Sequence, residues 1–253
     1  MLEDVARIAE EAGRIAAGRC DTAFNSWEKK PGEVVCDIDI EVDAFLRERL
    51  RALDPDAGWL SEETVDDSDR YERRRIWVVD PIDGTRDFLR RRPGWSVSIA
   101  LVEDRVPVVG VLASPQRGEL WTAERGTGSF RNGKRIRASD RTELAGARVP
   151  ADTLPPADID LVAVAKPNSI ALRIALVAAG EADLVATLRW GFEWDIAAAA
   201  LIAEEAGATV SGALGQPLAF NTASGEAFGV LVAAPGIHAA AVERLRERAL
   251  AVV

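Results

Sequence analysis

Acidic side chains in one short segment have the types and spacing of a metal site. The apolar run at residues 77–79 leads into Asp80, Asp83 and the pair Gly84-Thr85. Carboxylates on a tight turn offer the oxygen ligands that a hard divalent cation prefers, and the free N–H groups of such a turn bind phosphate. The alternative is a solvated Asp-Pro-x-Asp-Gly turn, which is common between strands. This motif alone leaves both interpretations open.

Further acids lie at predicted strand ends and helix starts. Glu62-Glu63 follows the short apolar piece at residues 59–60, Asp195 begins an alanine-rich helix, and Asp39 begins another helix. Each has an ordinary structural explanation, because a solvated pair suits a loop and an acid at a helix start is favoured by capping and by the helix dipole. Spacing does not establish that these groups converge, but it places each of them where ligands tend to be displayed.

The first half of the chain must position these acids with helices and an antiparallel meander. Apolar spacing predicts amphipathic helices, short β-rich runs predict strands, and Asn132-Gly133 predicts a hairpin turn. Residues 21–32 are interpreted as a loop, and the charged run 66–75 as a solvated surface segment without chemistry. We expect helices at residues 2–20 and 39–53, an extended start at 33–37, and strands at 76–80, 95–102, 106–113, 119–123 and 128–130.

The second half alternates strands with helices, which favours α/β layering. Residues 138–157 are interpreted as the connection between lobes, so the chain is predicted to form one compact unit with lobes at residues 1–140 and 141–253. The predicted fold class is therefore α/β (α+β). We expect strands at residues 161–165, 182–188, 209–210 and 228–233, and helices at 169–179, 194–206 and 237–251.

Composition and charge narrow the class of partner. The 253 residues are 48% hydrophobic and 28% charged, which is a globular composition, and the net charge is −10. Such a chain lacks the basic footprint of a protein that binds nucleic acid polymers. A phosphorylated ligand would be repelled unless metal ions or local basic residues received it.

Cysteine usage and hydropathy indicate the compartment. Cys20 and Cys36 lie outside any C-x-x-C pattern, so we expect a reducing compartment and no disulfide framework. Acids near the N-terminus argue against a signal peptide, and no run approaches the roughly 18 apolar residues of a membrane span. We therefore expect a soluble, cytoplasmic protein with no membrane partner.

Two motifs resemble the signatures of the inositol monophosphatase family of metal-dependent, lithium-sensitive phosphatases. Residues 80–85 (Asp-Pro-Ile-Asp-Gly-Thr) are similar to the first signature, and residues 194–198 with the tail 204–208 are similar to the second. The pair at 62–63 and the element at 35–39 match earlier family positions, and the order and spacing agree over nearly the whole chain. The resemblance implies an alternating α/β/α/β/α sandwich of the sugar-phosphatase type.

The same resemblance implies a set of metal ligands. Glu62 and Asp80, with the backbone carbonyl of Ile82, would bind one Mg²⁺. Asp80, Asp83 and Asp195 would bind a second ion, and Glu62 would help to position a third, weaker one. The implied cofactor is therefore two or three Mg²⁺ ions, with Li⁺ as an inhibitor.

Other positions would act on water and on the substrate. The resemblance implies that Asp39 and Thr85, with Glu62 at the metal, orient and deprotonate the attacking water. Gly84 and Thr85 would present N–H groups to the phosphate.

The implied chemistry suits these residue types. Mg²⁺ prefers oxygen ligands and lowers the pKa of a bound water, and a second ion stabilises the leaving oxygen of an in-line displacement. Asp83 and Asp195 are thus expected to contact the substrate as well as metal. His238 is not required, and we interpret it as structural or surface.

Departures from the inositol-specific pattern concern the substrate. Enzymes specific for inositol phosphate carry a Glu several residues before the second signature's Asp, where this chain has Leu188 followed by Arg189. Residues 86–88 and 93–103 look more like the bacterial 3′(2′),5′-bisphosphate nucleotidases, which convert adenosine 3′,5′-bisphosphate to AMP. Arg189 and Lys166 are either plain surface charges or partners of a second phosphate.

Other functions stay open. Inositol 1-phosphate, fructose 1,6-bisphosphate, histidinol phosphate and other sugar phosphates are alternative substrates. An inactive binding or regulatory protein on the same fold is a further alternative, which the full set of ligand residues disfavours. The family commonly forms homodimers, so we expect a homodimer. We expect its ligand to be a small phosphorylated metabolite.

Overall fold

A polar hairpin shows where local sequence misled the prediction. The computed structural model describes residues 1–30 and 33–253, and the last two residues of the predicted loop, Pro31 and Gly32, lie outside them. The loop prediction is wrong for β1 (Ser26–Lys30), which pairs antiparallel with β2 (Glu33–Cys36). Every side chain of β1 is exposed, so the strand lacks the apolar alternation by which strands are recognised.

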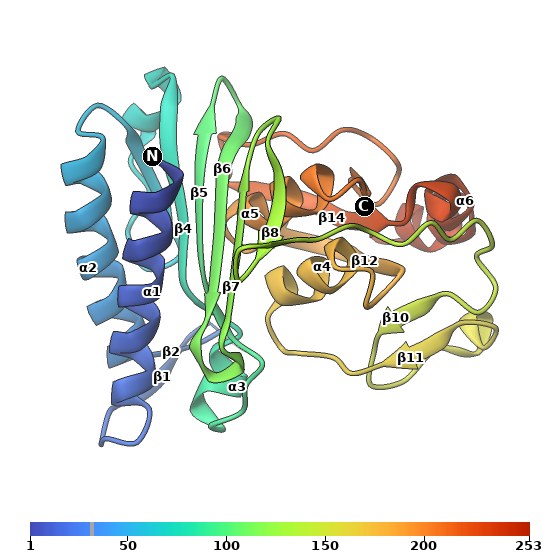
Figure 1. The fold of residues 1–253 in the computed structure, drawn as a ribbon, viewed down its shortest axis with the longest axis horizontal. Helices are drawn as coiled ribbons and strands as arrows, with labels where there is room; N and C mark the ends of the chain where they lie inside the picture. The colour runs from blue at the N-terminus through green and yellow to red at the C-terminus, as the bar shows by residue number, and fades with distance from the viewer. Residues whose placement is uncertain (31–32) are drawn as a thin grey trace.

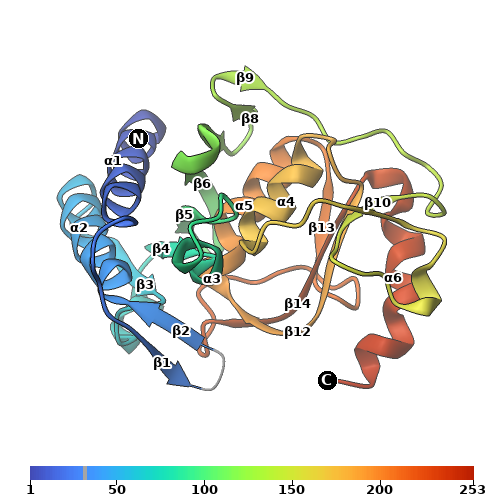
Figure 2. The ribbon, with the colours of Figure 1, turned by 90° about the horizontal axis from the view of Figure 1, so that it is seen from below.

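Helices and sheets alternate through the molecule (Figure 1). Helices α1 (Leu2–Arg19) and α2 (Asp37–Leu53) cover one face of a large sheet, and α4 (Ile170–Ala178) and α5 (Glu193–Glu205) cover the other. In Figure 2, α4 and α5 lie between the large sheet and a smaller one, which α6 (Pro235–Leu250) covers from outside. The described residues thus confirm the predicted α/β/α/β/α layering.

The large sheet contains seven strands among the described residues, in the order β3-β4-β5-β6-β7-β8-β9. Only its first pair, β3 with β4, is parallel, so the predicted meander is confirmed from β4 onward. A Cβ on Gly110 of β6 would stand 2.7 Å from the Ala198 carbonyl, so glycine lets α5 approach the sheet closely. The strands are β3 (Gly58–Ser61), β4 (Arg75–Asp83), β5 (Ser96–Glu103), β6 (Val106–Ser114), β7 (Glu119–Glu124), β8 (Gly128–Arg131) and β9 (Lys134–Arg135).

The small sheet has the order β12-β14-β13 and is antiparallel throughout its described pairs. Its strands are β12 (Leu184–Phe192), β14 (Glu226–Ala233) and β13 (Thr209–Ser211). Part of the predicted connection at 138–157 forms β10 (Arg148–Pro150), which pairs in parallel with β11 (Val162–Val164). Short helical turns complete the described elements: η1 (Ser68–Glu72), α3 (Thr85–Leu89), η2 (Pro115–Arg117) and η3 (Pro156–Asp158).

The charged run at residues 66–75 is not uniformly solvated, and that prediction is wrong at Arg70. Its side chain is 2% exposed and donates to the Asn221 side chain and to the Thr222 carbonyl oxygen at 2.9 Å. Asp66 neutralises the guanidinium with two hydrogen bonds. Arg70 therefore joins η1 to a loop far away in the chain.

The two halves of the chain pack against each other, because α5 of the second half contacts β5 and β6 of the first. The division into lobes near residue 140 stays a prediction. Within the described residues, no helix combines the length and the apolar character needed to cross a membrane.

Candidate active site

The carboxylates of Asp80, Asp83 and Asp195 meet in one cluster. One oxygen from each lies within 4.8 Å of the others, although Asp195 comes from a different half of the chain. Sequence spacing does not establish this convergence. The carboxylates converge because the C-terminal end of β4 lies next to the N-terminal end of α5.

An irregularity in β4 places two of these acids together. Residues three apart on a regular strand point to opposite faces, but the pairing of β4 with β5 shifts between Asp80 and Asp83. The Ile82 amide donates to the Asp80 carboxylate at 2.9 Å within this turn. Gly84 then adopts φ 95°, and a Cβ there would stand 2.8 Å from both Gly94 O and Ser169 N, so only glycine fits.

The N-terminus of α4 holds Asp83. Its carboxylate accepts the Ser169 hydroxyl, the Ala171 amide at 2.8 Å and the Ile170 amide at 3.3 Å. Burial nevertheless raises the pKa of Asp83, because these hydrogen bonds only partly offset the loss of water. Hydrogen-bond donors therefore fix the position of the Asp83 carboxylate. Its negative charge would be stabilised further by a bound cation.

Asp195 and Asp39 both lie in the first turn of a helix, as the capping interpretation predicts. Asp39 is 1% exposed and accepts the backbone N–H of Cys36 at 2.8 Å and its thiol at 2.9 Å, as in a capping box. Asp39 also accepts the Thr85 hydroxyl at 3.4 Å, so capping and contact with the site coexist. Burial, and then the charge of Asp83, raises the pKa of Asp195 to about 7.

Glu62 faces the same acids, whereas Glu63 turns to a lysine. Burial and then the charge of Asp195 raise the pKa of Glu62 well above its usual value. Glu63 forms an ion pair with Lys29 at 2.6 Å, and Lys29 also donates to the Glu62 carbonyl oxygen at 3.3 Å. The adjacent glutamates therefore have different surroundings. Lys29 was missed because it lies in the polar segment interpreted as a loop.

The electrostatics of the cluster suit a divalent cation. Burial comes first among the causes that raise the pKa of Asp80, followed by the charges of Glu62 and Asp83. Carboxylates this close oppose one another's ionisation unless a positive ion lies among them. Buried oxygen donors without sulfur or imidazole match the preference of Mg²⁺. The residues present therefore fit the metal that the sequence implies.

A cavity of about 600 Å³ opens over the acids and is called here the catalytic cavity. Its acidic side contains Glu62, Asp80, Asp83 and Asp195. The remaining wall is rich in cations, which makes the cavity sharply polarised. These cations are Lys29, Lys30, Arg86, Lys166, Arg173 and Arg189.

Arg173 is a cation of this wall that sequence reasoning missed. It lies in the middle of α4, where the helical pattern gave no sign of chemistry. Its guanidinium donates to the carbonyl oxygens of Pro167 at 2.7 Å and Asn168 at 2.6 Å, which fixes its direction. Arg189, which the sequence singled out, lines the same cavity but is exposed.

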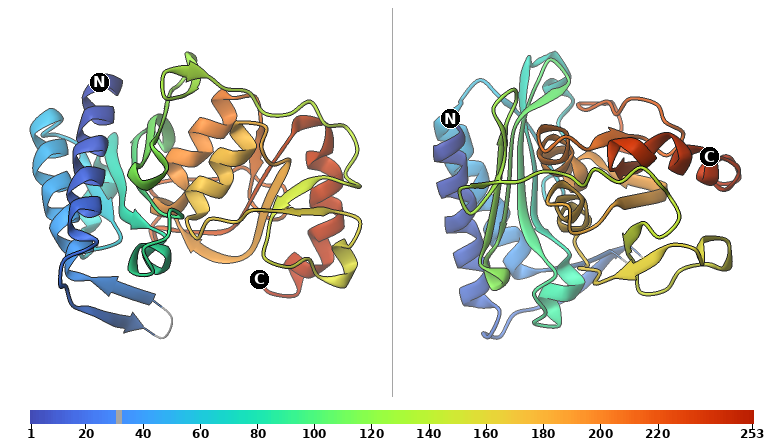
Figure 3. Two further views of the ribbon diagram at one scale, coloured as in Figure 1. Left: turned by 60° about the horizontal axis from the view of Figure 1, so that its bottom comes forward. Right: turned by 45° about the vertical axis from the view of Figure 1, so that its right-hand side comes forward.

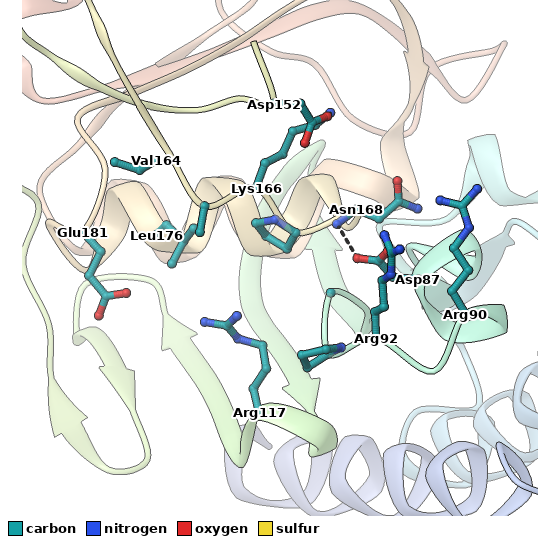
Figure 4. A pocket seen from close by; sticks show the side chains of 14 residues that line it. Asp87, Arg90, Arg92, Arg117, Asp152, Val164, Lys166, Asn168, Leu176 and Glu181 are labelled. Atoms are coloured by element: carbon teal, nitrogen blue, oxygen red, sulfur yellow. Dashed lines mark hydrogen bonds and ion pairs between the residues drawn. The ribbon is translucent and has the colours of Figure 1, made fainter.

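A second basic cavity, of about 500 Å³, adjoins the first across Lys166 and Asn168 (Figure 4). Arg90, Arg92 and Arg117 surround it, and the Asn168 amide donates to Asp87 at 3.2 Å along its edge. The loop between β11 and α4 therefore separates two cation-lined spaces.

His238 and Glu193 lie outside the catalytic cavity. His238 is half-buried and hydrogen-bonds to the Ser211 hydroxyl at 2.9 Å, which agrees with a structural role. Glu193 is fully buried and accepts the Asn221 amide at 2.6 Å and the Thr222 amide at 2.8 Å. It therefore anchors the start of α5.

Known proteins with similar sequences and structures identify the family of this chain. The family model described as "Inositol monophosphatase family" matches residues 1–253. A 3′(2′),5′-bisphosphate nucleotidase CysQ of Aggregatibacter actinomycetemcomitans is 30% identical over 87% of each chain. A fructose-1,6-bisphosphatase/inositol-1-monophosphatase of Thermotoga maritima is 34% identical over 77% of this chain and 76% of its own.

A solved structure extends the likeness to the fold. An IMPase of Thermotoga maritima superposes with a TM-score of 0.84 at 28% identity, covering 97% of this chain and 96% of the other. The match spans both sheets and every layer of helices that the described residues form. The chain belongs to the inositol monophosphatase family and is a metal-dependent phosphomonoesterase.

Proposed function

We propose that this enzyme removes one phosphate from a small bisphosphorylated metabolite, and that its substrate is adenosine 3′,5′-bisphosphate. The observation that carries the proposal is the polarised catalytic cavity. Its acids would hold metal against the phosphate that is cleaved, while Arg173 and Arg189 offer positive charge to a second phosphate. Lys166 lines the same wall but is already paired with Asp152 at 2.5 Å. A bisphosphate satisfies both sides at once.

The metal would be held by Asp80, Asp83, Asp195 and Glu62, with the carbonyl oxygen of Ile82. When bound, Mg²⁺ supplies a polarised phosphate and a water of lowered pKa. These residues would also keep the phosphate oxygens oriented for an in-line displacement.

The protein's own contribution to proton transfer lies at Thr85. Its hydroxyl donates to the Ile82 carbonyl oxygen at 3.0 Å and lies 3.4 Å from the Asp39 carboxylate. With its O–H turned from Ile82 toward Asp39, the hydroxyl can receive a proton from the attacking water while Asp39 takes up its own. The Gly84 and Thr85 amides at the start of α3 would donate to the phosphate.

Leu188 favours a nucleotide over inositol as the leaving group. A sugar polyol needs polar side chains that accept hydrogen bonds from its hydroxyls, and a leucine cannot accept them. The similarity to a protein named as a bisphosphate nucleotidase supports this choice. The similarity to a protein named as a fructose-1,6-bisphosphatase/inositol-1-monophosphatase keeps inositol 1-phosphate as the second candidate.

Phosphate release, measured with malachite green in Mg²⁺, tests the proposal. We expect faster turnover of adenosine 3′,5′-bisphosphate than of inositol 1-phosphate or fructose 1,6-bisphosphate, inhibition by Li⁺, and no release by Asp83→Asn. Arg173→Gln should raise the KM for the bisphosphate about tenfold, because a charge-assisted contact is lost. Equal or faster turnover of inositol 1-phosphate would defeat the nucleotidase assignment.

A further inference from the structure

A third cavity, of about 380 Å³, lies between β12, the β10 segment and α6. We propose that it binds the apolar base of the nucleotide from which the phosphate is removed. This inference rests on the proposed function and adds a binding site for the part of the substrate that does not react. The cavity, called here the base cavity, is lined by Pro150, Leu154, Leu161, Leu184, Leu188 and Leu245, among others.

The base cavity adjoins the catalytic cavity. Lys166 and Arg173 line both of them, so these two side chains form the boundary between the cavities. Arg173 is held in place by two carbonyl oxygens of the β11–α4 loop. A ligand held at the acids would therefore have these cations and the base cavity beside it.

The three surroundings match the three groups that the ribose of a nucleoside bisphosphate carries. The acids and their metal meet the phosphate that is cleaved, the cations at the boundary meet the second phosphate, and the apolar lining meets the base. A polyol phosphate such as inositol 1-phosphate has no group that would gain from the apolar end.

One face of β12 supplies the floor of the base cavity. Leu184, Ala186 and Leu188 alternate along the strand, so their side chains share a face. Ala186 and Leu188 are only half-buried, although both pack against the cluster of apolar residues under α6. Apolar surface is thus left for a ligand to cover, which is the main source of affinity for a flat base.

Two of the cations that line this cavity, Arg244 and Arg248, are already neutralised. Arg244 donates to both carboxylate oxygens of Asp160, at 2.8 and 2.9 Å, and Arg248 does the same with Asp158, at 2.7 and 2.9 Å. These pairs make the interior unsuitable for a phosphate. They also fasten the segment before β11 to α6, and in the left view of Figure 3 β10 and β11 lie beside α6. The walls are therefore formed before any ligand binds.

Calorimetric titration in Mg²⁺ with AMP and with ribose 5-phosphate isolates the base, because the two ligands share a ribose phosphate. We expect the parent enzyme to bind AMP at least tenfold more tightly. Ala186→Phe fills the floor of the cavity and should bring the ratio of the two affinities near one. Ala239→Phe, at an exposed position of α6, is the matched control and should keep the ratio of the parent.

The outcomes separate this inference from the proposed function. Equal affinities in the parent, or an unchanged ratio in Ala186→Phe, would overturn the base cavity even if the bisphosphate is the preferred substrate. If the enzyme does not prefer adenosine 3′,5′-bisphosphate but the affinities for AMP and ribose 5-phosphate differ as expected, only the nucleotidase assignment is overturned. Should Ala186→Phe melt without cooperativity, Leu188→Gln replaces it, with the same expected loss of the ratio.

Discussion

The Ser169 hydroxyl donates to the carboxylate of Asp83 and thereby joins the first turn of α4 to the end of β4, 86 residues earlier in the chain. The same oxygen accepts the Leu172 amide at 2.9 Å, so Ser169 is also the N-cap of the helix. The positive end of the α4 dipole is directed at an acid that must stay ionised to hold metal. A single side chain thus couples the stability of a helix to the geometry of the metal site.

Ser169→Ala should therefore weaken the metal site and the helix together. Loss of the cap costs about 1 kcal/mol. Loss of a hydrogen bond that orients a metal ligand lowers metal affinity about tenfold. Asp67→Ala removes the cap of η1, outside the catalytic cavity, and should leave the Mg²⁺ dependence unchanged. Titration of activity with Mg²⁺ checks this, and an unaltered midpoint for Ser169→Ala would contradict the coupling.

The metal-free enzyme should lose stability as pH rises from about 4 to about 7. Burial, and then the charge of Asp83, raises the pKa of Asp195 to about 7, whereas an aspartate in an unfolded chain has a pKa of about 3.9. Between these values the folded chain binds more protons than the unfolded chain, so the free energy of unfolding falls with increasing pH.

Melting in EDTA at several pH values tests that sign. We expect Tm to fall by about 5 to 10 °C between pH 5 and 8, to recover when Mg²⁺ is added, and to change less in Asp195→Asn. A Tm that rises over this interval in EDTA would show that the acids are not destabilised by one another.

The pKa of Asp183 is shifted in the opposite direction to that of Asp195, because Asp183 is paired with Arg148. Burial alone would raise the pKa of Asp183, but hydrogen bonds from Arg148 and Ser139 outweigh it and lower the pKa to about 2. The stability that Asp183 contributes is present above the pKa of an unfolded aspartate and is lost as pH falls toward 2.

Asp183→Ala should accordingly cost about 3 kcal/mol at pH 7, because the Arg148 side chain and backbone amide lose their acceptor. Asp160→Ala breaks a more exposed pair with Arg244 and should cost much less, because solvent screens that pair. Urea unfolding at pH 7 and pH 3 distinguishes them, and the difference between the parent and Asp183→Ala should shrink at the lower pH.

Arg91 ends α3 in a conformation that glycine adopts at less cost. Its φ is 55°, and the Arg91 amide bonds to Phe88 O at 2.9 Å while the Arg92 amide bonds to Asp87 O at 2.8 Å, as in a Schellman motif. Arg91→Gly should raise stability by about 0.5 to 1 kcal/mol. Arg90→Gly, at φ −89°, should not. Thermal melting compares the two, and a less stable Arg91→Gly would contradict the assigned strain.

Local signals predicted the helices and most strands because those elements are amphipathic or bounded by turns. Asn132 and Gly133 show the hairpin turn directly, with φ of 50° and 73°. The acids of the first signature follow a buried strand, so their positions at its end were also predictable. The layering was predicted chiefly from the family resemblance.

The burial and contacts of some residues could not be predicted from the sequence, because their partners lie far away in the chain. Arg70 is buried because Asn221 and Thr222 receive it, and nothing in residues 66–75 encodes that contact. Arg173 looks like an ordinary helical position until the β11–α4 loop turns it toward the catalytic cavity. The shift in β4 pairing that brings Asp80 and Asp83 together depends on β5 as well as β4.

Glu193 should matter to the metal site although it does not face the catalytic cavity. It lies two residues before Asp195 and accepts the amides of Asn221 and Thr222 and the Thr222 hydroxyl at 2.6 Å. Glu193→Ala leaves these donors unpaired in a buried place, so we expect a loss of about 3 kcal/mol and a higher Mg²⁺ requirement. Glu193→Gln keeps an acceptor oxygen and should lose less of both. Melting temperatures and Mg²⁺ titrations of the two variants would refute this anchoring if Glu193→Ala matched the parent.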